Sequence, residues 1–72
     1  MWTTGNLENG CKYCMKHFAE PSEEYGIDGG RISKLEIRVD GTVTLRFDRG
    51  WDIEPEDEAT QMVYAILLHE FN

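Results

Sequence analysis

Alternating apolar and polar positions are clearest in the middle of the chain, over residues 31–48. The apolar positions are Leu35, Ile37 and Val39 before Asp40-Gly41, and Val43, Leu45 and Phe47 after it. A period of two on both sides of an Asp-Gly pair predicts a β-hairpin.

The length of the hairpin loop follows from side-chain parity. A two-residue loop of Asp40-Gly41 would set the apolar residues of one strand opposite the polar residues of the other. A three-residue loop, residues 39–41 with Gly41 in the left-handed conformation, instead pairs Ile37 with Val43 and Leu35 with Leu45. Because a slip of one residue turns every side chain to the wrong face, we expect the three-residue, bulged turn.

The last part of the chain has helical spacing. Its apolar stripe consists of Ala59, Met62, Val63, Ile66 and Leu67. Pro55 suits a first helical turn, and the acids at 54 and 56–58 suit the electropositive end of a helix. Tyr64, Leu68 and Phe71 widen the stripe beyond what one sheet face covers. We therefore expect Trp51 or Trp2 to fold over the excess, or a second copy of the chain to cover it in a homodimer.

Residues 9–18, "NGCKYCMKHF", are compatible with two structures. In a helix, Asn9 would be the cap and both cysteines would share a face. In a strand, Asn9-Gly10 would form a tight turn, Cys11 would face the core, and Cys14 would face water between Lys12 and Lys16. Because a lone hairpin is marginally stable, the strand is the preferred interpretation.

These elements predict an α+β fold. We expect a three- or four-stranded antiparallel sheet with one C-terminal helix packed on one face, forming a single small domain over residues 1–72. Pro21 and the glycines at 26, 29 and 30 mark residues 19–31 as a loop.

Three blocks of sequence resemble a small uncharacterised domain family of Gram-positive bacteria and their phages. They are "EPSEEYGIDGGRISKLEI", "FDRGWDIEP" and a leading W-x-T-G-x-L-E. The resemblance implies an antiparallel sheet followed by a C-terminal helix, and it carries no activity. Cys11 and Cys14 lie outside these blocks.

The composition limits the cellular location and the classes of partner that we expect. No signal peptide is visible, and the longest apolar-rich stretch, residues 62–68, is too short for a membrane span, so we expect a cytoplasmic protein with free thiols and no membrane partner. The net charge of −7 disfavours nucleic acid as a partner.

The spacing Cys11-x2-Cys14-x2-His17 suggests zinc, thiol redox or nucleophilic chemistry. In a strand, however, residues three apart point to opposite faces, so the two sulfurs could not share one ion or one substrate. We therefore expect no metal, no cofactor and no catalytic site, and hence no enzyme.

Binding is the remaining function. If the helix covers the apolar side of the sheet, the open side carries Lys34, Arg38 and Arg46, joined by Lys12 and Lys16 in the strand interpretation. Trp51, in "DRGWD", is either a lid on the core or part of a binding loop. We expect a non-enzymatic protein-interaction or accessory module, phage- or prophage-associated by the resemblance, with an unidentified protein partner. The alternative is a weak single-stranded nucleic-acid binder that uses the basic sheet face.

Overall fold

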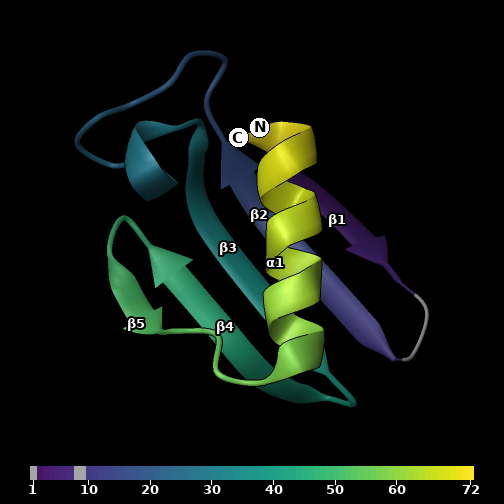
Figure 1. Ribbon diagram of the computed structural model, residues 1–72. Coiled ribbons are helices and arrows are strands. Elements are labelled where there is room, and N and C mark those ends of the chain that lie inside the picture. Colours follow the sequence, from purple (N-terminus) through teal and green to yellow (C-terminus); the bar gives the residue numbers. More distant parts are fainter. Residues whose placement is uncertain (1, 8–9) are drawn as a thin grey trace.

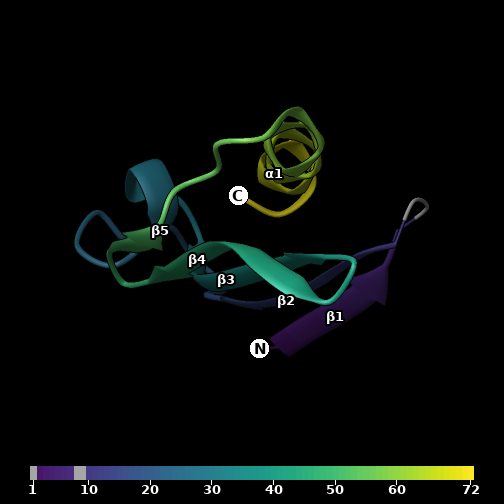
Figure 2. The ribbon, with the colours of Figure 1, turned by 90° about the horizontal axis from the view of Figure 1, so that it is seen from below.

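The chain folds into one antiparallel sheet covered on one face by one helix (Figures 1 and 2). The computed structural model describes residues 2–7 and 10–72, without the side chain of Trp2. Consecutive strands are neighbours in the order β1-β2-β3-β4-β5. The elements are β1 (Trp2–Asn6), β2 (Cys11–His17), a 3-10 turn η1 (Ile27–Gly29), β3 (Ile32–Val39), β4 (Thr42–Asp48), β5 (Trp51–Ile53) and α1 (Glu58–Phe71).

The predicted α+β class and the C-terminal helix are confirmed, but the sheet has five strands rather than three or four. The additional strand, β5, follows a tight turn in which Arg49 has a positive φ of 56°. The Asp48 N–H donates to the Gly50 carbonyl at 2.9 Å. This turn returns Trp51 to a position opposite Phe47.

Residues 11–17 form a strand, which settles the choice between helix and strand. β2 pairs with β1 on one side and with β3 on the other, so it lies inside the sheet. Cys11 and Met15 are buried on the helix side, as the strand interpretation predicts. The predicted Asn9-Gly10 turn lies partly outside the described residues, because Asn9 is not among them.

The β3–β4 hairpin corrects the predicted loop. Val39 is opposite Thr42, so the loop is the two-residue Asp40-Gly41, whose φ angles of 51° and 83° are those of a type I′ turn. The register then shifts beyond Arg38, which is opposite Val43.

This register shift aligns the apolar faces of the two strands, which a two-residue loop alone would place opposite polar residues. Thr44 is an extra residue in β4, so Ile37 faces Leu45 and Leu35 faces Phe47. A β-bulge of this kind adds one residue to one strand of an antiparallel pair. The conflict is therefore resolved inside the strand rather than at the turn, and the predicted partners of Ile37 and Leu35 are wrong.

The helix begins later than expected. Pro55 precedes the helix instead of lying in its first turn, because Asp57 is the N-cap. Its carboxylate accepts the Thr60 N–H at 3.0 Å, which satisfies one of the unpaired donors at the helix start.

The buried face of the helix is also turned relative to the predicted stripe. Val63 and Leu67 are buried, but Met62 and Ile66 are exposed. In their place Thr60 is fully buried, and three residues expected only to widen the stripe pack against the core: Tyr64, Leu68 and Phe71.

Thr60 explains this orientation. Its hydroxyl oxygen lies 2.6 Å from Asp57 Oδ1 and 2.7 Å from Thr44 Oγ1. Because a carboxylate only accepts, the Thr60 hydroxyl donates to Asp57 and accepts from the bulged Thr44. The bulge in β4 thus holds the start of the helix over the sheet.

The end of the helix is tied to the long loop between β2 and β3. Asn72 Oδ1 accepts the Ile32 N–H at 3.0 Å, and Nδ2 donates to the Ile27 carbonyl at 3.0 Å. Arg31 Nε donates to the Phe71 carbonyl at 3.0 Å. The predicted loop contains the short turn η1, whose Ile27 is buried in the core.

Candidate functional site

Five basic side chains gather on the sheet face that the helix leaves open. We call this surface the basic face: Lys12 and Lys16 of β2, Lys34 and Arg38 of β3, and Arg46 of β4. Each alternates along its strand with residues of the buried core, so strand periodicity alone turns it away from the helix. Figure 2 shows the helix above the sheet and this face below it.

Glu36 lies among these bases. Its carboxylate accepts from Arg46 Nη2 at 2.8 Å and from Arg38 Nε at 3.3 Å. The hydrogen bond from Arg46 is the largest cause that lowers the pKa of Glu36; partial burial opposes it, and Arg38 adds to the lowering. The same contact raises the pKa of Arg46.

Two more carboxylates border the basic face. Lys34 Nζ lies 3.7 Å from Asp48 Oδ1, and Arg46 Nη1 lies 3.9 Å from Asp52 Oδ2. Five bases and three acids give this face a charge of about +2, although the chain as a whole carries −7. The face is therefore a patterned surface of both signs rather than a uniformly positive one.

Open hollows lie on this face on either side of Cys14. One, of about 290 Å³, is bordered by Lys34, Arg46 and Asp48. The other, of about 220 Å³, is bordered by Lys12 and Arg38. Both include Cys14 and Glu36, so they adjoin. Open depressions of this size suit the side chains of a partner better than an enclosed small molecule.

The two cysteines lie on opposite faces of the sheet, as predicted. Cys11 is buried in the core, whereas Cys14 is half-buried on the basic face. His17 lies on the core side, with its ring 5.8 Å from that of Phe71 and its Nε2 3.1 Å from Thr3 Oγ1. The Cys-x2-Cys-x2-His spacing therefore does not converge on one point. Within residues 2–7 and 10–72, no group of three potential ligands could hold a metal ion.

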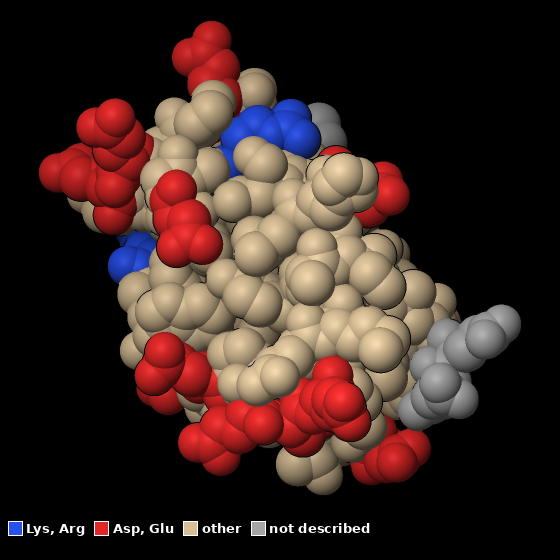
Figure 3. Space-filling view, viewed as in Figure 1, with Lys and Arg blue, Asp and Glu red and all other residues tan. Residues whose placement is uncertain are grey.

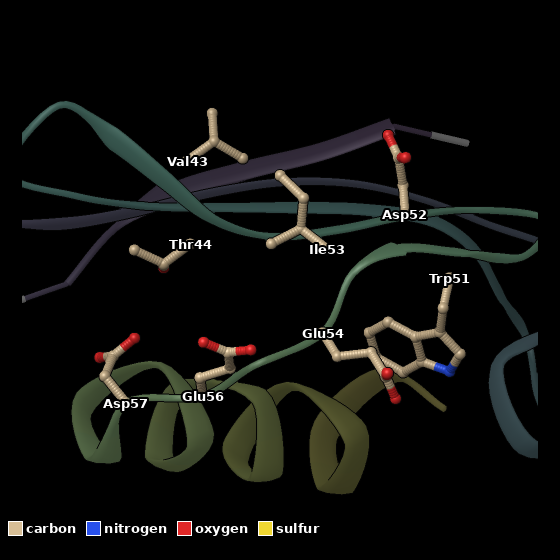
Figure 4. A pocket seen from close by; sticks show the side chains of 8 residues that line it. All are labelled: Val43, Thr44, Trp51, Asp52, Ile53, Glu54, Glu56 and Asp57. Carbon is tan, nitrogen blue, oxygen red and sulfur yellow. The ribbon is translucent and has the colours of Figure 1, made fainter.

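Trp51 is the one candidate binding residue that the structure separates from the bases. Figure 4 shows its ring directed toward the helix, while Asp52 points to the opposite side of the sheet. The indole packs edge-on against Phe47 at 5.1 Å and Tyr64 at 5.6 Å between ring centroids. Trp51 thus joins sheet to helix, as expected of a lid, and remains 41% exposed.

A further hollow, not predicted from the sequence, lies between β4, β5 and the start of the helix (Figure 4). It has a volume of about 510 Å³ and is lined by Val43, Thr44, Trp51, Asp52, Ile53, Glu54, Glu56 and Asp57. The run of acids at 52–58 is the feature of the sequence that corresponds to this hollow. The position of these acids before a helix already accounts for them, so they do not by themselves indicate a hollow.

Comparison with known protein families gives one result. The model of a domain of unknown function, DUF7678, matches residues 1–72. The chain belongs to this family. No curated protein and no solved structure matched the chain. Membership of DUF7678 agrees with the resemblance to a small uncharacterised domain. It attaches no activity to the basic face.

Among the described residues, no helix has the length and apolar character needed to cross a membrane. The longest helix, α1, has 14 residues.

Proposed function

We propose that this DUF7678 chain is a small non-enzymatic interaction module whose basic face binds an acidic surface of another protein. The observation that carries the proposal is the sorting of charge. Five of the seven Lys and Arg residues occupy one uncovered sheet face, although acids outnumber bases two to one in the sequence. The resemblance to a family of Gram-positive bacteria and their phages supports an accessory role associated with a phage or prophage, and we propose a cytoplasmic location for the module.

The ion pairs on the face favour a protein over a polyanion. Glu36 engages Arg38 and Arg46, and Asp48 engages Lys34, so at least three of the five bases already have carboxylate neighbours. Nucleic-acid affinity rises with the number of phosphates that a protein neutralises. A face of about +2 provides few such contacts, whereas complementary charges of both signs give specificity between proteins.

One observation favours the alternative, single-stranded nucleic acid. Phe18 shares a small hollow of about 130 Å³ with Lys16, Lys34 and Arg49 at one end of the basic face. An aromatic ring beside bases is the arrangement on which a nucleobase stacks while its phosphate is neutralised. The two candidates therefore use overlapping residues and must be separated by experiment.

The experiment measures binding of two probes to the intact chain: an acidic peptide rich in Glu, and a mixed-sequence single-stranded oligonucleotide. We expect the peptide to bind, and Lys12→Gln combined with Lys34→Gln to weaken it about three- to tenfold, since each rim charge contributes modestly. Arg31→Gln, a base at the helix end that borders neither the basic face nor the hollow beside Phe18, is the matched control, with circular dichroism to show that it folds.

The outcomes separate the candidates. Peptide binding that the Lys12 and Lys34 exchanges leave unchanged would place the contact elsewhere and refute the proposal. Oligonucleotide binding that falls steeply with salt, without peptide binding, would favour the nucleic-acid alternative.

A further inference from the structure

The outer face of α1 carries apolar side chains that the sheet does not cover. Met62 is 64% exposed and Ile66 is 48% exposed. They lie one turn apart, so they are neighbours on the helix surface. Ala59 and Ala65 are also exposed, and the sequence has no charged residue from Ala59 to His69. We call Ala59, Met62, Ala65 and Ile66 the apolar helix face.

Acidic side chains lie around this apolar face. Figure 3 shows an uncharged centre over the helix, with acids gathered at its lower end and along one side, while bases appear only toward the margins. Glu58 begins the helix and Glu70 lies near its end. Asp28 is close enough that its charge adds to burial in raising the pKa of Tyr64.

The two bases outside the basic face do not offset these acids. Arg31 donates to the Phe71 carbonyl at the helix end, and Arg49 lies 3.8 Å from Asp48 and over the ring of Tyr25. The acids at 54 and 56–58 precede or begin α1 and Glu70 lies near its end, whereas the sequence has no Lys or Arg after Arg49. The helix side of the molecule is therefore apolar at its centre and negative around it.

This charge distribution indicates which kind of partner can bind the apolar helix face. A second copy packed helix to helix would bring acids against acids. A partner with apolar residues on one side and Lys or Arg beside them would bury Met62 and Ile66 while it pairs with the surrounding carboxylates. Met62 also suits such a contact, because an unbranched thioether side chain adapts to irregular surfaces.

We propose that the apolar helix face binds a basic amphipathic helix of a partner protein. The two helices pack side by side, with the partner's apolar residues against Met62 and Ile66 and its basic residues toward the acids at the ends of α1. This surface lies on the opposite side of the sheet from the basic face, so its success or failure is independent of the function proposed above.

Two designed peptides test the proposal by NMR titration of the intact, isotope-labelled chain. Both have about 14 residues with Leu at helical spacing; the remaining positions are Lys in one and Glu in the other. We expect the Lys peptide to bind with chemical-shift changes centred on residues 59–69 and not on β2–β4. The Glu peptide should cause no changes at residues 59–69, because its charge matches that of the surrounding acids; any changes that it causes should lie on the basic face.

Variants locate the contact. Met62→Gln combined with Ile66→Gln should weaken the Lys peptide about tenfold, while circular dichroism confirms that the helix remains, since both side chains are largely exposed. Leu7→Gln, an exposed apolar residue outside the helix, should leave binding unchanged.

Four results would overturn the proposal: no binding of the Lys peptide, equal changes at residues 59–69 from both peptides, Lys-peptide changes centred on the basic face, or Lys-peptide binding that the two Gln substitutions leave unchanged. Light scattering of the chain alone adds a fifth. If the chain forms a dimer, and the Gln substitutions at 62 and 66 convert it to a monomer, this face would be assigned to a second copy.

Discussion

At the scale of single residues, Asp57 connects the sheet to the helix through one carboxylate. It accepts the Thr60 N–H at 3.0 Å and the Thr60 hydroxyl at 2.6 Å, and that hydroxyl also meets Thr44. These two bonds from Thr60 are the main reasons that the pKa of Asp57 lies below its ordinary value of 3.8. The folded chain therefore favours the ionised form of Asp57 more than the unfolded chain does.

The ionised form of Asp57 makes the stability of the fold depend on pH. A carboxyl group whose pKa is lowered by folding stabilises the fold above its unfolded pKa, and this contribution is lost as pH falls through the folded pKa. We expect the free energy of unfolding, measured by urea titration, to fall between about pH 5 and pH 2. The fall should be less steep for Asp57→Asn, because an asparagine side chain still caps the helix but does not titrate there.

Glu20→Gln, in the exposed loop, controls for the loss of one negative charge. Parallel pH profiles for the Asp57→Asn variant and the original chain would contradict the role given to this carboxylate.

At the scale of elements, the β3–β4 hairpin combines a tight turn with a bulge. The turn requires Asp40 and Gly41 to adopt positive φ angles, which glycine tolerates at little cost. The bulge at Thr44 then restores the alignment of the two apolar faces.

Two glycines test the turn separately from packing. A Cβ atom at Gly41 or at Gly50 would meet nothing within 4 Å, but only Gly41 of the two has a positive φ, 83°. Gly41→Ala should therefore lower the free energy of unfolding by about 1–2 kcal/mol through backbone strain alone. Gly50→Ala should change it little. Equal effects of the two substitutions in chemical denaturation would show that the turn conformation does not contribute.

The elements differ in how far the sequence predicts them. Alternation identifies the two hairpin strands, because it records which face of each strand is buried. The hairpin needs further strands beside it, and this need favours a strand at β2. The position of the bulge depends on Thr44 reaching Thr60 across the fold, a contact that no local pattern records. β5 has only three residues, too few to show a period, and its Trp51 suggested a loop.

The helix, too, is only partly predictable from the sequence. Its apolar residues nearly encircle it, so periodicity identifies a helix but does not decide which side is buried. A single polar residue decides it: Thr60 is buried through its bonds to Asp57 and Thr44. Met62 and Ile66, expected in the core, are consequently on the surface. Of the candidate binding residues, strand parity predicted the five bases together, while Trp51 depended on a strand that the sequence did not reveal.

At the scale of the whole molecule, Asn72 joins segments distant in the sequence. Its side chain bonds both Ile27 and Ile32, each about 3.0 Å away, and its amide occupies the space next to Gly30. The helix end, η1 and the start of β3 are thereby held together.

Asn72→Ala should remove both side-chain bonds and leave the Ile32 N–H unpaired, while the Ile27 carbonyl still accepts the Gly30 N–H at 2.8 Å. We expect a loss of about 1–3 kcal/mol in the free energy of unfolding, the usual cost of unsatisfied buried groups. Faster hydrogen exchange at the Ile32 amide should accompany it. Asn6→Ala, on exposed β1, is the control. An unchanged exchange rate at Ile32 would contradict this role for Asn72.

The separation of charge between the basic face and the helix side also has a kinetic consequence. The basic face carries about +2, while the acids at 54 and 56–58 lie at the start of the helix, which covers the other face of the sheet, so the molecule has an electric dipole. An approaching charged partner exerts a torque on such a dipole, so the molecule turns its complementary side forward before contact. Association with either partner would then be fast in dilute buffer and slow as salt is added, with dissociation changing far less.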